Sequence, residues 1–251
     1  MKIISSTQNR SIKEMCDLHT PKGRKEAQAF IAEGIRILES FSQAQWNPEQ
    51  LYVIEDHLKN ASELFPHINQ AHIFIVSYEV MKKISTATTP SGILAVFAIP
   101  QPSLPITLSS GIVLAQIQDP GNMGTLIRSA TAFGYKTVVL VEGCDPYSSK
   151  VIQSTAGTIA YMQLISLSWD ELLQNKGSLN LCALVVNNGT EPQKLNVEHS
   201  LLVVGNEAHG LPDAWIQQCQ QRMTIPMHSS TESLNAAVAG SIALFLLKNN
   251  K

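Results

Sequence analysis

Residues 225–239 of this chain are IPMHSSTESLNAAVA. An apolar segment ends at Pro226, a loop of small hydroxylated side chains follows, and an apolar helix is predicted over 233–248. The first N–H groups of a helix have no partner inside the helix and face outward, where a ligand can use them. The stretch therefore predicts a ligand-binding loop that leads into a helix.

Two other loops share this setting, because each leaves a predicted strand at its carboxyl end. They are QDPGNMGTLIR at 118–128 and VGNEAHGLP at 204–212. Ligands in open parallel sheets lie beyond the carboxyl ends of the strands. We therefore expect the three loops to converge on one polar crevice.

The second half of the chain alternates apolar strands with helical segments. Near-continuous apolar strands are typical of parallel sheets that are buried on both faces. This pattern predicts an α/β fold with a mostly parallel sheet and helices on both faces, preceded by a smaller α/β domain. The strands are expected at 112–117, 137–141, 161–165, 179–186 and 201–204, and the helices at 122–133, 148–156, 169–175 and 233–248.

The smaller domain is predicted at 1–98, and the larger one at 110–251. Between them, 99–109 is predicted to be a linker, because Pro100, Pro102 and Pro105 disfavour both helix and strand. In the smaller domain we expect strands at 29–33, 51–54, 73–76 and 93–98, and helices at 11–28, from Gly34 onward, at 57–65 and at 78–85.

The composition is that of a cytoplasmic globular protein. Of 251 residues, 44% are hydrophobic and 15% charged, which argues against a disordered chain. No apolar run reaches the roughly 18 residues of a membrane span, and the first residues lack the apolar core of a signal peptide. The four cysteines form no CxxC pair and are interpreted as reduced thiols. Two loop histidines, His209 and His228, do not make a metal site, so no metal is expected.

A basic arm stands out against the overall net charge of −2. Residues 1–25 carry six basic and two acidic side chains, a net charge of +4 that would attract phosphates. A solvated amphipathic helix explains the same pattern, so charge alone does not establish an RNA partner. The candidate RNA-binding residues of this arm are Arg10, Lys13, Lys22, Arg24 and Lys25.

The loop residues have structural explanations as well as functional ones. Asn122 stands where a helix cap belongs, Ser233 is a candidate N-cap of the last helix, and Arg128 has the position of a solvated side chain. Glu207 lies between Gly205 and Gly210, and these two glycines allow the backbone to approach a ligand closely. The chain has no GxGxxG, GxxxxGK[ST] or GxSxG pattern, which disfavours conventional NAD, ATP and esterase chemistry.

Together the three loops resemble the motifs of the SpoU/TrmH family of RNA ribose 2'-O-methyltransferases, in the SPOUT superfamily. The first motif matches as Asn122 and Arg128 in DPGNMGTLIRSATAFG, the second as GNEAHGL at 205–211, and the third as IPM at 225–227 with SLN at 233–235. The resemblance covers 108–248. More weakly, 25–100 is similar to the family's substrate-binding domain, through FIAEG at 30–34 and TPSGILAV at 89–96. Ser229 departs from the pattern, because the family often has glycine there.

The resemblance implies S-adenosylmethionine as methyl donor, a C-terminal trefoil knot, and a homodimer whose sites combine residues of both subunits. The apolar last helix fits a dimer interface, although a buried core helix explains it equally well. By carry-over, the cofactor is bound by Gly205, Gly210, Leu211, Ile225, Met227 and Leu234, and the catalytic set is Arg128, Asn122, Glu207, Ser233 and Asn235.

The implied reaction is attack of a ribose 2'-hydroxyl on the sulfonium methyl group. The family assigns the activating role to Arg128, but a guanidinium with a pKa above about 12 is a poor base. We therefore expect Arg128 to bind the adjacent phosphate and stabilise the developing alkoxide, while the other four residues position the reactants. The separate N-terminal domain favours structured ribosomal RNA as substrate. Transfer RNA, an RNA-binding protein without catalysis, and a nucleotide-binding enzyme unrelated to RNA are the alternatives.

Overall fold

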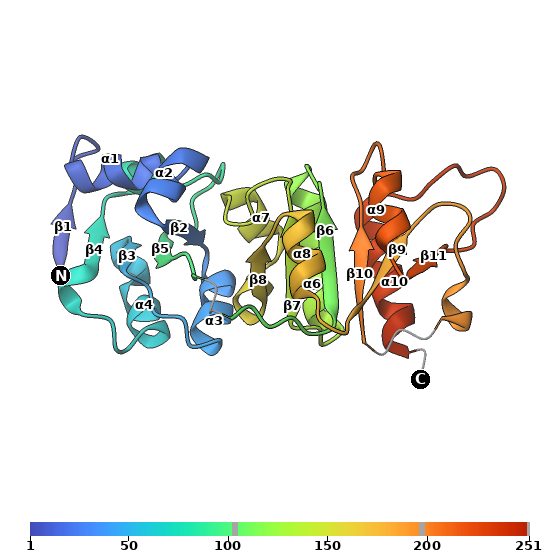
Figure 1. The fold of residues 1–251 in the computed structure, drawn as a ribbon. Helices are drawn as coiled ribbons and strands as arrows, with labels where there is room; N and C mark the ends of the chain where they lie inside the picture. Colours follow the sequence, from blue (N-terminus) through green and yellow to red (C-terminus); the bar gives the residue numbers. More distant parts are fainter. Residues whose placement is uncertain (102–104, 196–198, 250–251) are drawn as a thin grey trace. The chain divides into compact units, whose positions relative to one another are not determined.

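A computed structural model describes residues 1–101, 105–195 and 199–249 of the chain. The chain forms two compact units (Figure 1). The first consists of 1–101 together with 145–160, and the second of 102–144 together with 161–251. The first unit therefore takes in a segment that lies inside the predicted larger domain, 110–251. Of the predicted linker 99–109, residues 102–104 lie outside the described part.

The first unit is built on a mixed sheet with the order β1-β4-β3-β5-β2. Strands β1, β4 and β3 are parallel, and β5 runs antiparallel to both β3 and β2. Four of these strands match predicted ones to within one residue, whereas β1 was not predicted. The strands are β1 (Lys2–Ile4), β2 (Ala29–Glu33), β3 (Gln50–Val53), β4 (Ile73–Val76) and β5 (Ile93–Ala98).

Helices cover both faces of this sheet, and the one predicted at 11–28 is two helices. The first helix ends at Asp17. Thr20 caps the second, because its hydroxyl accepts the Gly23 N–H at 3.0 Å and Pro21 can start a helix but not continue one. The helices of this unit are α1 (Arg10–Asp17), α2 (Pro21–Ala27), α3 (Ile35–Gln43), α4 (Leu58–Leu64), α5 (Tyr78–Ile84) and α7 (Ser149–Ser154), with 3₁₀ turns at Glu55–His57, Gln70–His72 and Thr158–Tyr161.

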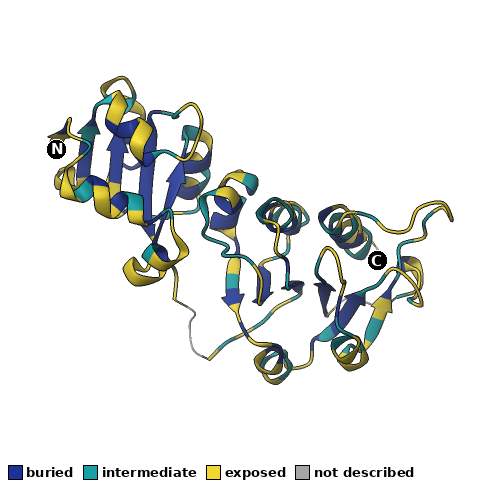
Figure 2. Ribbon diagram, turned by 90° about the horizontal axis from the view of Figure 1, so that it is seen from above, coloured by how far each residue is buried: buried dark blue, intermediate teal, exposed yellow. Residues whose placement is uncertain are grey.

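The two faces of the sheet have different cores. Helices α1 and α5 bury aliphatic side chains such as Ile12 and Met81 against one face. The other face holds an aromatic cluster around Phe30, Phe41 and Phe97. The segment 145–160 completes this cluster, because the Tyr147 ring lies 4.9 Å from that of Phe30. Figure 2 shows the buried residues concentrated on the strands.

The second unit contains a fully parallel sheet with the order β11-β9-β10-β6-β7-β8. The predicted α/β class and parallel sheet are confirmed. Strand β11 was not predicted, because three residues are too short to show a period. The strands are β6 (Gly111–Ala115), β7 (Thr137–Val141), β8 (Gln163–Ser166), β9 (Asn180–Leu184), β10 (Ser200–Val204) and β11 (Gln221–Met223).

Alternate residues of these strands face two helical layers. Val113, Val139 and Val203 belong to a cluster that includes α8 and α9, in which the Trp169 and Trp215 rings stack at 4.6 Å. On the other face α6 packs on α10, where a Cβ at Gly240 would collide with the Leu126 side chain. The helices are α6 (Pro120–Ala132), α8 (Trp169–Asn175), α9 (Asp213–Gln218) and α10 (Ala236–Asn249), with a 3₁₀ turn at Pro192–Lys194.

The trefoil knot stays an expectation from the family resemblance. Within the described residues, every helix is too short or too polar to cross a membrane.

Candidate functional site

A hydrogen-bond network brings the three predicted loops together at the carboxyl ends of β6 and β10. The Glu207 carboxylate accepts the backbone N–H of Asp119 at 3.0 Å and that of Gln118 at 3.2 Å. It also accepts the side-chain amide N–H of Asn122 at 3.1 Å. The second loop is therefore tied to the first by a single carboxylate.

The third loop joins the network through Asn235. Its side-chain N–H donates to the side-chain amide oxygen of Asn122 at 3.0 Å. The side-chain amide oxygen of Asn235 accepts the N–H groups of Ala237 at 2.9 Å and Val238 at 3.2 Å. Asn235 thus caps α10 and fixes the start of that helix relative to α6.

Two capping roles considered from the sequence are wrong. Asn122 is not the cap of α6, because Asp119 accepts the Asn122 N–H at 2.8 Å and Pro120 follows at the first helical position. Ser233 does not cap α10, since Asn235 does. The Asn122 side chain is free to link Glu207 to Asn235 because another residue closes the helix end.

The network keeps Glu207 ionised. Partial burial by itself raises the pKa of the Glu207 carboxyl, but hydrogen bonds from Asp119 and Gln118 and from the Asn122 amide outweigh it. The pKa consequently lies below its ordinary value, so at neutral pH Glu207 acts as an acceptor only.

The second loop has the conformation that its glycines permit. Asn206 and Gly210 exchange two backbone hydrogen bonds of 3.0 and 2.9 Å, and Gly210 has a φ of +67°. The Asn206 side chain donates to the Gln116 carbonyl at 2.9 Å and accepts the N–H groups of Ala208 and His209. A side chain at Gly205 would collide with the backbone of Gly210 and Leu211. Only glycine fits at 205.

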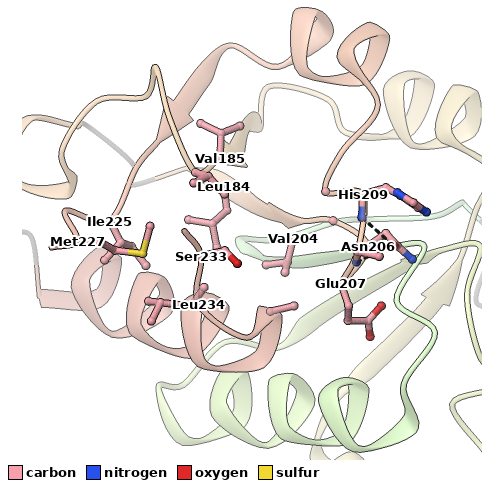
Figure 3. A pocket seen from close by; sticks show the side chains of 16 residues that line it. Leu184, Val185, Val204, Asn206, Glu207, His209, Ile225, Met227, Ser233 and Leu234 are labelled. Carbon is pink, nitrogen blue, oxygen red and sulfur yellow. Dashed lines mark hydrogen bonds between the residues drawn. The ribbon is translucent and has the colours of Figure 1, made fainter. Parts of the chain in front are cut away.

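A pocket of about 280 Å³ opens beside this network. Figure 3 shows apolar side chains around it, while the Glu207 carboxylate points away from them. Its walls come from the ends of β9 and β10, the second loop and the third loop. The lining residues are Leu184, Val185, Val186, Val204, Gly205, Asn206, Glu207, Ala208, His209, Gly210, Ile225, Met227, Ser233, Leu234, Ala236 and Ala239.

Most predicted cofactor residues line this pocket. Gly205, Gly210, Ile225, Met227 and Leu234 do so, as do Glu207 and Ser233 of the predicted catalytic set. Leu211 does not, because its side chain is 7% exposed and packs in the core on the side of α8 and α9.

The end of β9 is a wall of the pocket that sequence reasoning missed. Leu184, Val185 and Val186 line it, and Val186 is 47% exposed. The strand was predicted to end at Val186, so the rule that ligands lie beyond strand ends pointed to these residues.

Arg128 makes no hydrogen bond to the network of its own chain among the described residues. It is exposed on α6 and does not line the pocket. Among the described residues its guanidinium has no hydrogen-bond or ion-pair partner. The guanidinium is therefore available to another molecule.

One residue of the predicted RNA-binding arm is misassigned. Arg24 is 3% exposed, pairs with Asp145 at 2.7 Å and donates to the Leu18 carbonyl at 2.8 Å. Its charge is neutralised inside the first unit, so it is unsuited to bind RNA. Arg10 and Lys22 are exposed but pair with Glu14 and Glu26 on their own helices. Lys13 and Lys25 are exposed.

Comparison with known proteins agrees with this geometry. Residues 109–245 match the SpoU rRNA Methylase family, and 9–95 match the MRM3-like substrate binding domain. The chain belongs to the SpoU rRNA methylase family. The resemblance seen in the motifs is thereby confirmed, and the N-terminal match agrees with the predicted substrate-binding domain.

Three relatives extend over nearly the whole chain. The 23S rRNA (guanosine(2553)-2'-O)-methyltransferase RlmP of Bacillus subtilis is 28% identical over 99% of this chain and 100% of its own. A solved RNA 2'-O ribose methyltransferase has a TM-score of 0.80 at 29% identity, covering 98% and 97% of the two chains. The AdoMet-bound rRNA methyltransferase of Sinorhizobium meliloti, at 23% identity, shares the fold with a TM-score of 0.86 over 98% and 97%.

Proposed function

We propose that this protein transfers the methyl group of S-adenosylmethionine to a ribose 2'-hydroxyl of ribosomal RNA. The observation that carries the proposal is the network from Glu207 through Asn122 to Asn235, which joins all three family motifs beside one pocket. Relatives that match over nearly the full length are named as 2'-O-methyltransferases, and one is named for 23S ribosomal RNA.

The pocket suits the chemical groups of the cofactor. Leu184, Val186, Ile225, Met227 and Leu234 offer apolar surface to the adenine ring and the aliphatic chain. The close approach of Gly205 to Gly210 leaves backbone groups of the second loop next to the pocket. When bound, S-adenosylmethionine supplies an electrophilic methyl group on a sulfonium sulfur.

Arg128 is the residue we assign to the RNA ribose and its phosphate. Its exposed guanidinium binds a phosphate and stabilises negative charge on the 2'-oxygen as the methyl group is transferred. A guanidinium does not accept the hydroxyl proton, which leaves to a phosphate oxygen or to water. Glu207, Asn122 and Asn235 act as positioning residues, because their polar groups are used by each other and by the backbone.

Arg128 does not line the pocket of its own chain, which favours a homodimer. Val238, Ile242 and Phe245 of α10 are 48%, 37% and 50% exposed, and the Phe245 ring contacts Phe133 at the end of α6. This apolar strip lies on the same two-helix layer as Arg128. A second copy covering the strip would bury it, and an arginine on that layer could then serve the site of the other copy. Light scattering at micromolar concentration should give twice the chain mass, and a monomer would contradict this part.

The decisive experiment compares wild type with Arg128→Ala. With radiolabelled S-adenosylmethionine, wild type should label ribosomal RNA from a strain that lacks the gene, and RNase digestion should locate the label on a ribose. Arg128→Ala should lower transfer by at least about 100-fold, while calorimetry shows cofactor affinity within a few fold. Loss of cofactor binding would instead make Arg128 a cofactor ligand.

Two outcomes would overturn the proposal in favour of its alternatives. Labelling of transfer RNA only would keep the chemistry and change the substrate. Cofactor binding and RNA binding without any labelling would indicate an RNA-binding member of the fold that lacks catalysis.

A further inference from the structure

Helix α5 of the first unit presents an aromatic ring to solvent. Tyr78 is 53% exposed, and its hydroxyl has no partner among the described residues. The opposite side of the helix is anchored, because Val80, Met81 and Ile84 are completely buried in the core. The ring thus stands on a rigid support rather than on a mobile loop. Exposed aromatic rings held in this way are suited to stacking on a planar ligand.

One exposed lysine lies on the same side of α5 as this ring. Lys82 lies one helical turn after Tyr78 on the same side of α5 and is exposed without an ion pair. Helix α1 packs on α5, and Lys83 donates to the Thr7 carbonyl at 3.0 Å just before α1.

Among the described residues, Glu79 of α5 makes no ion pair with Lys82. Hydrogen bonds from its own backbone N–H and from Ser77 lower the pKa of the Glu79 carboxyl. Glu79 is therefore occupied at the start of the helix, where a negative charge stabilises the helix dipole. The ammonium group of Lys82 is exposed and unpaired, so a phosphate can bind it.

The loop after α5, residues 85–91, extends this surface and is held by a buried carboxylate of β2. The Glu33 carboxylate, on a residue that is 4% exposed, accepts the Ser85 hydroxyl at 2.7 and 2.9 Å and the Ser91 N–H at 3.2 Å. Both ends of the loop are thereby held, while residues 86–89, which include three threonines, are exposed. Hydroxyl groups on a held loop can donate to and accept from a polar ligand without a large loss of entropy.

We infer that α5 and the loop 85–91 form the surface on which the first unit binds unpaired nucleotides of the RNA substrate. This inference rests on the proposed RNA methylation and names the surface that recognises the substrate. A base stacks on Tyr78, and a flanking phosphate contacts Lys82. The target is single-stranded, because a base inside a duplex has no free face to offer an aromatic ring.

The test measures RNA affinity apart from methyl transfer. Fluorescence anisotropy of labelled 23S ribosomal RNA fragments should show binding about tenfold weaker for Tyr78→Ala, since stacking on one base is worth about 1–3 kcal/mol. Tyr78→Phe keeps the ring and should stay within about twofold. Lys82→Gln should weaken binding and reduce the salt slope by about 0.7 for one lost phosphate contact.

A matched control is Lys59→Gln, which removes an exposed lysine from α4 on the opposite face of the same sheet. It should leave affinity and salt slope unchanged. Unchanged affinity of Tyr78→Ala, or equal losses for Tyr78→Ala and Tyr78→Phe, would overturn the stacking surface. Wild type that binds RNA in a Tyr78-dependent way but transfers no methyl group would refute the proposed function alone. Wild type that binds no RNA would refute both.

Discussion

In each unit of this protein one carboxylate fixes a loop by hydrogen bonds, but the two carboxylates lie in different surroundings. Glu207 sits in an exposed loop and binds two backbone N–H groups and an amide at the start of α6. Glu33 is the last residue of a buried strand and binds the hydroxyl of Ser85 and the backbone of Ser91. The first orders a site among three loops, whereas the second supports a loop from the interior.

This difference determines what a mutation disturbs. Removing an exposed acceptor leaves the released N–H groups in contact with water, so the fold survives while the site loses its geometry. Removing a buried acceptor leaves polar groups without water, so the cost is paid in folding free energy. Glu207 should therefore report on catalysis, and Glu33 on stability and RNA recognition.

The largest expected effect is that of Glu207→Ala on methyl transfer. Without the carboxylate, Asn122 loses its orientation toward Asn235, and kcat/KM should fall about 100-fold, or about 2.7 kcal/mol. The melting temperature should change little. Glu191→Ala, which removes an exposed carboxylate paired with Lys194, is the matched control. An activity within threefold of wild type would show that the network does not organise the site.

Glu33→Ala should act mainly on stability. The loss of the hydrogen bonds from Ser85 and Ser91 to this buried carboxylate should lower the free energy of unfolding by about 2 kcal/mol in urea titrations. Cofactor affinity should remain unchanged, and RNA affinity should fall because the loop 85–91 is released. Glu63→Ala on the exposed side of α4 should cost less than about 0.5 kcal/mol. If Glu33→Ala were equally harmless, the contrast between the two carboxylates would fail.

The smallest expected effect is the contribution of Glu207 to the pH dependence of folding stability. Its pKa is lower in the folded protein than the ordinary value of 4.5. The stabilisation is therefore complete above that value and is lost as the pH falls through the lowered pKa. Melting temperatures at pH 7 and pH 4 should differ slightly less for Glu207→Gln than for wild type. A larger difference in the variant would reverse the expected sign.

Much of the fold followed from local patterns. The apolar runs 137–141 and 73–76 coincide with β7 and β4, because strands buried on both faces leave no room for polar residues. Short elements such as β1 and α9 escaped, since three to six residues carry no readable period and depend on their neighbours. The segment 145–160 gave no local sign of joining the first unit, because Tyr147 and Asp145 acquire that role only by meeting Phe30 and Arg24.

By itself, the sequence determined the α/β class, the family and the three loops that carry the site. These are properties of short stretches, in which glycine, proline and polar residues have to stand in a given order for the backbone to turn and approach a ligand. Only the tertiary structure decided that Asn235 caps α10, that Arg24 is buried and that Tyr78 and Lys82 share an exposed helical face. Burial and partnership depend on which distant segments pack together, and no local pattern contains that information.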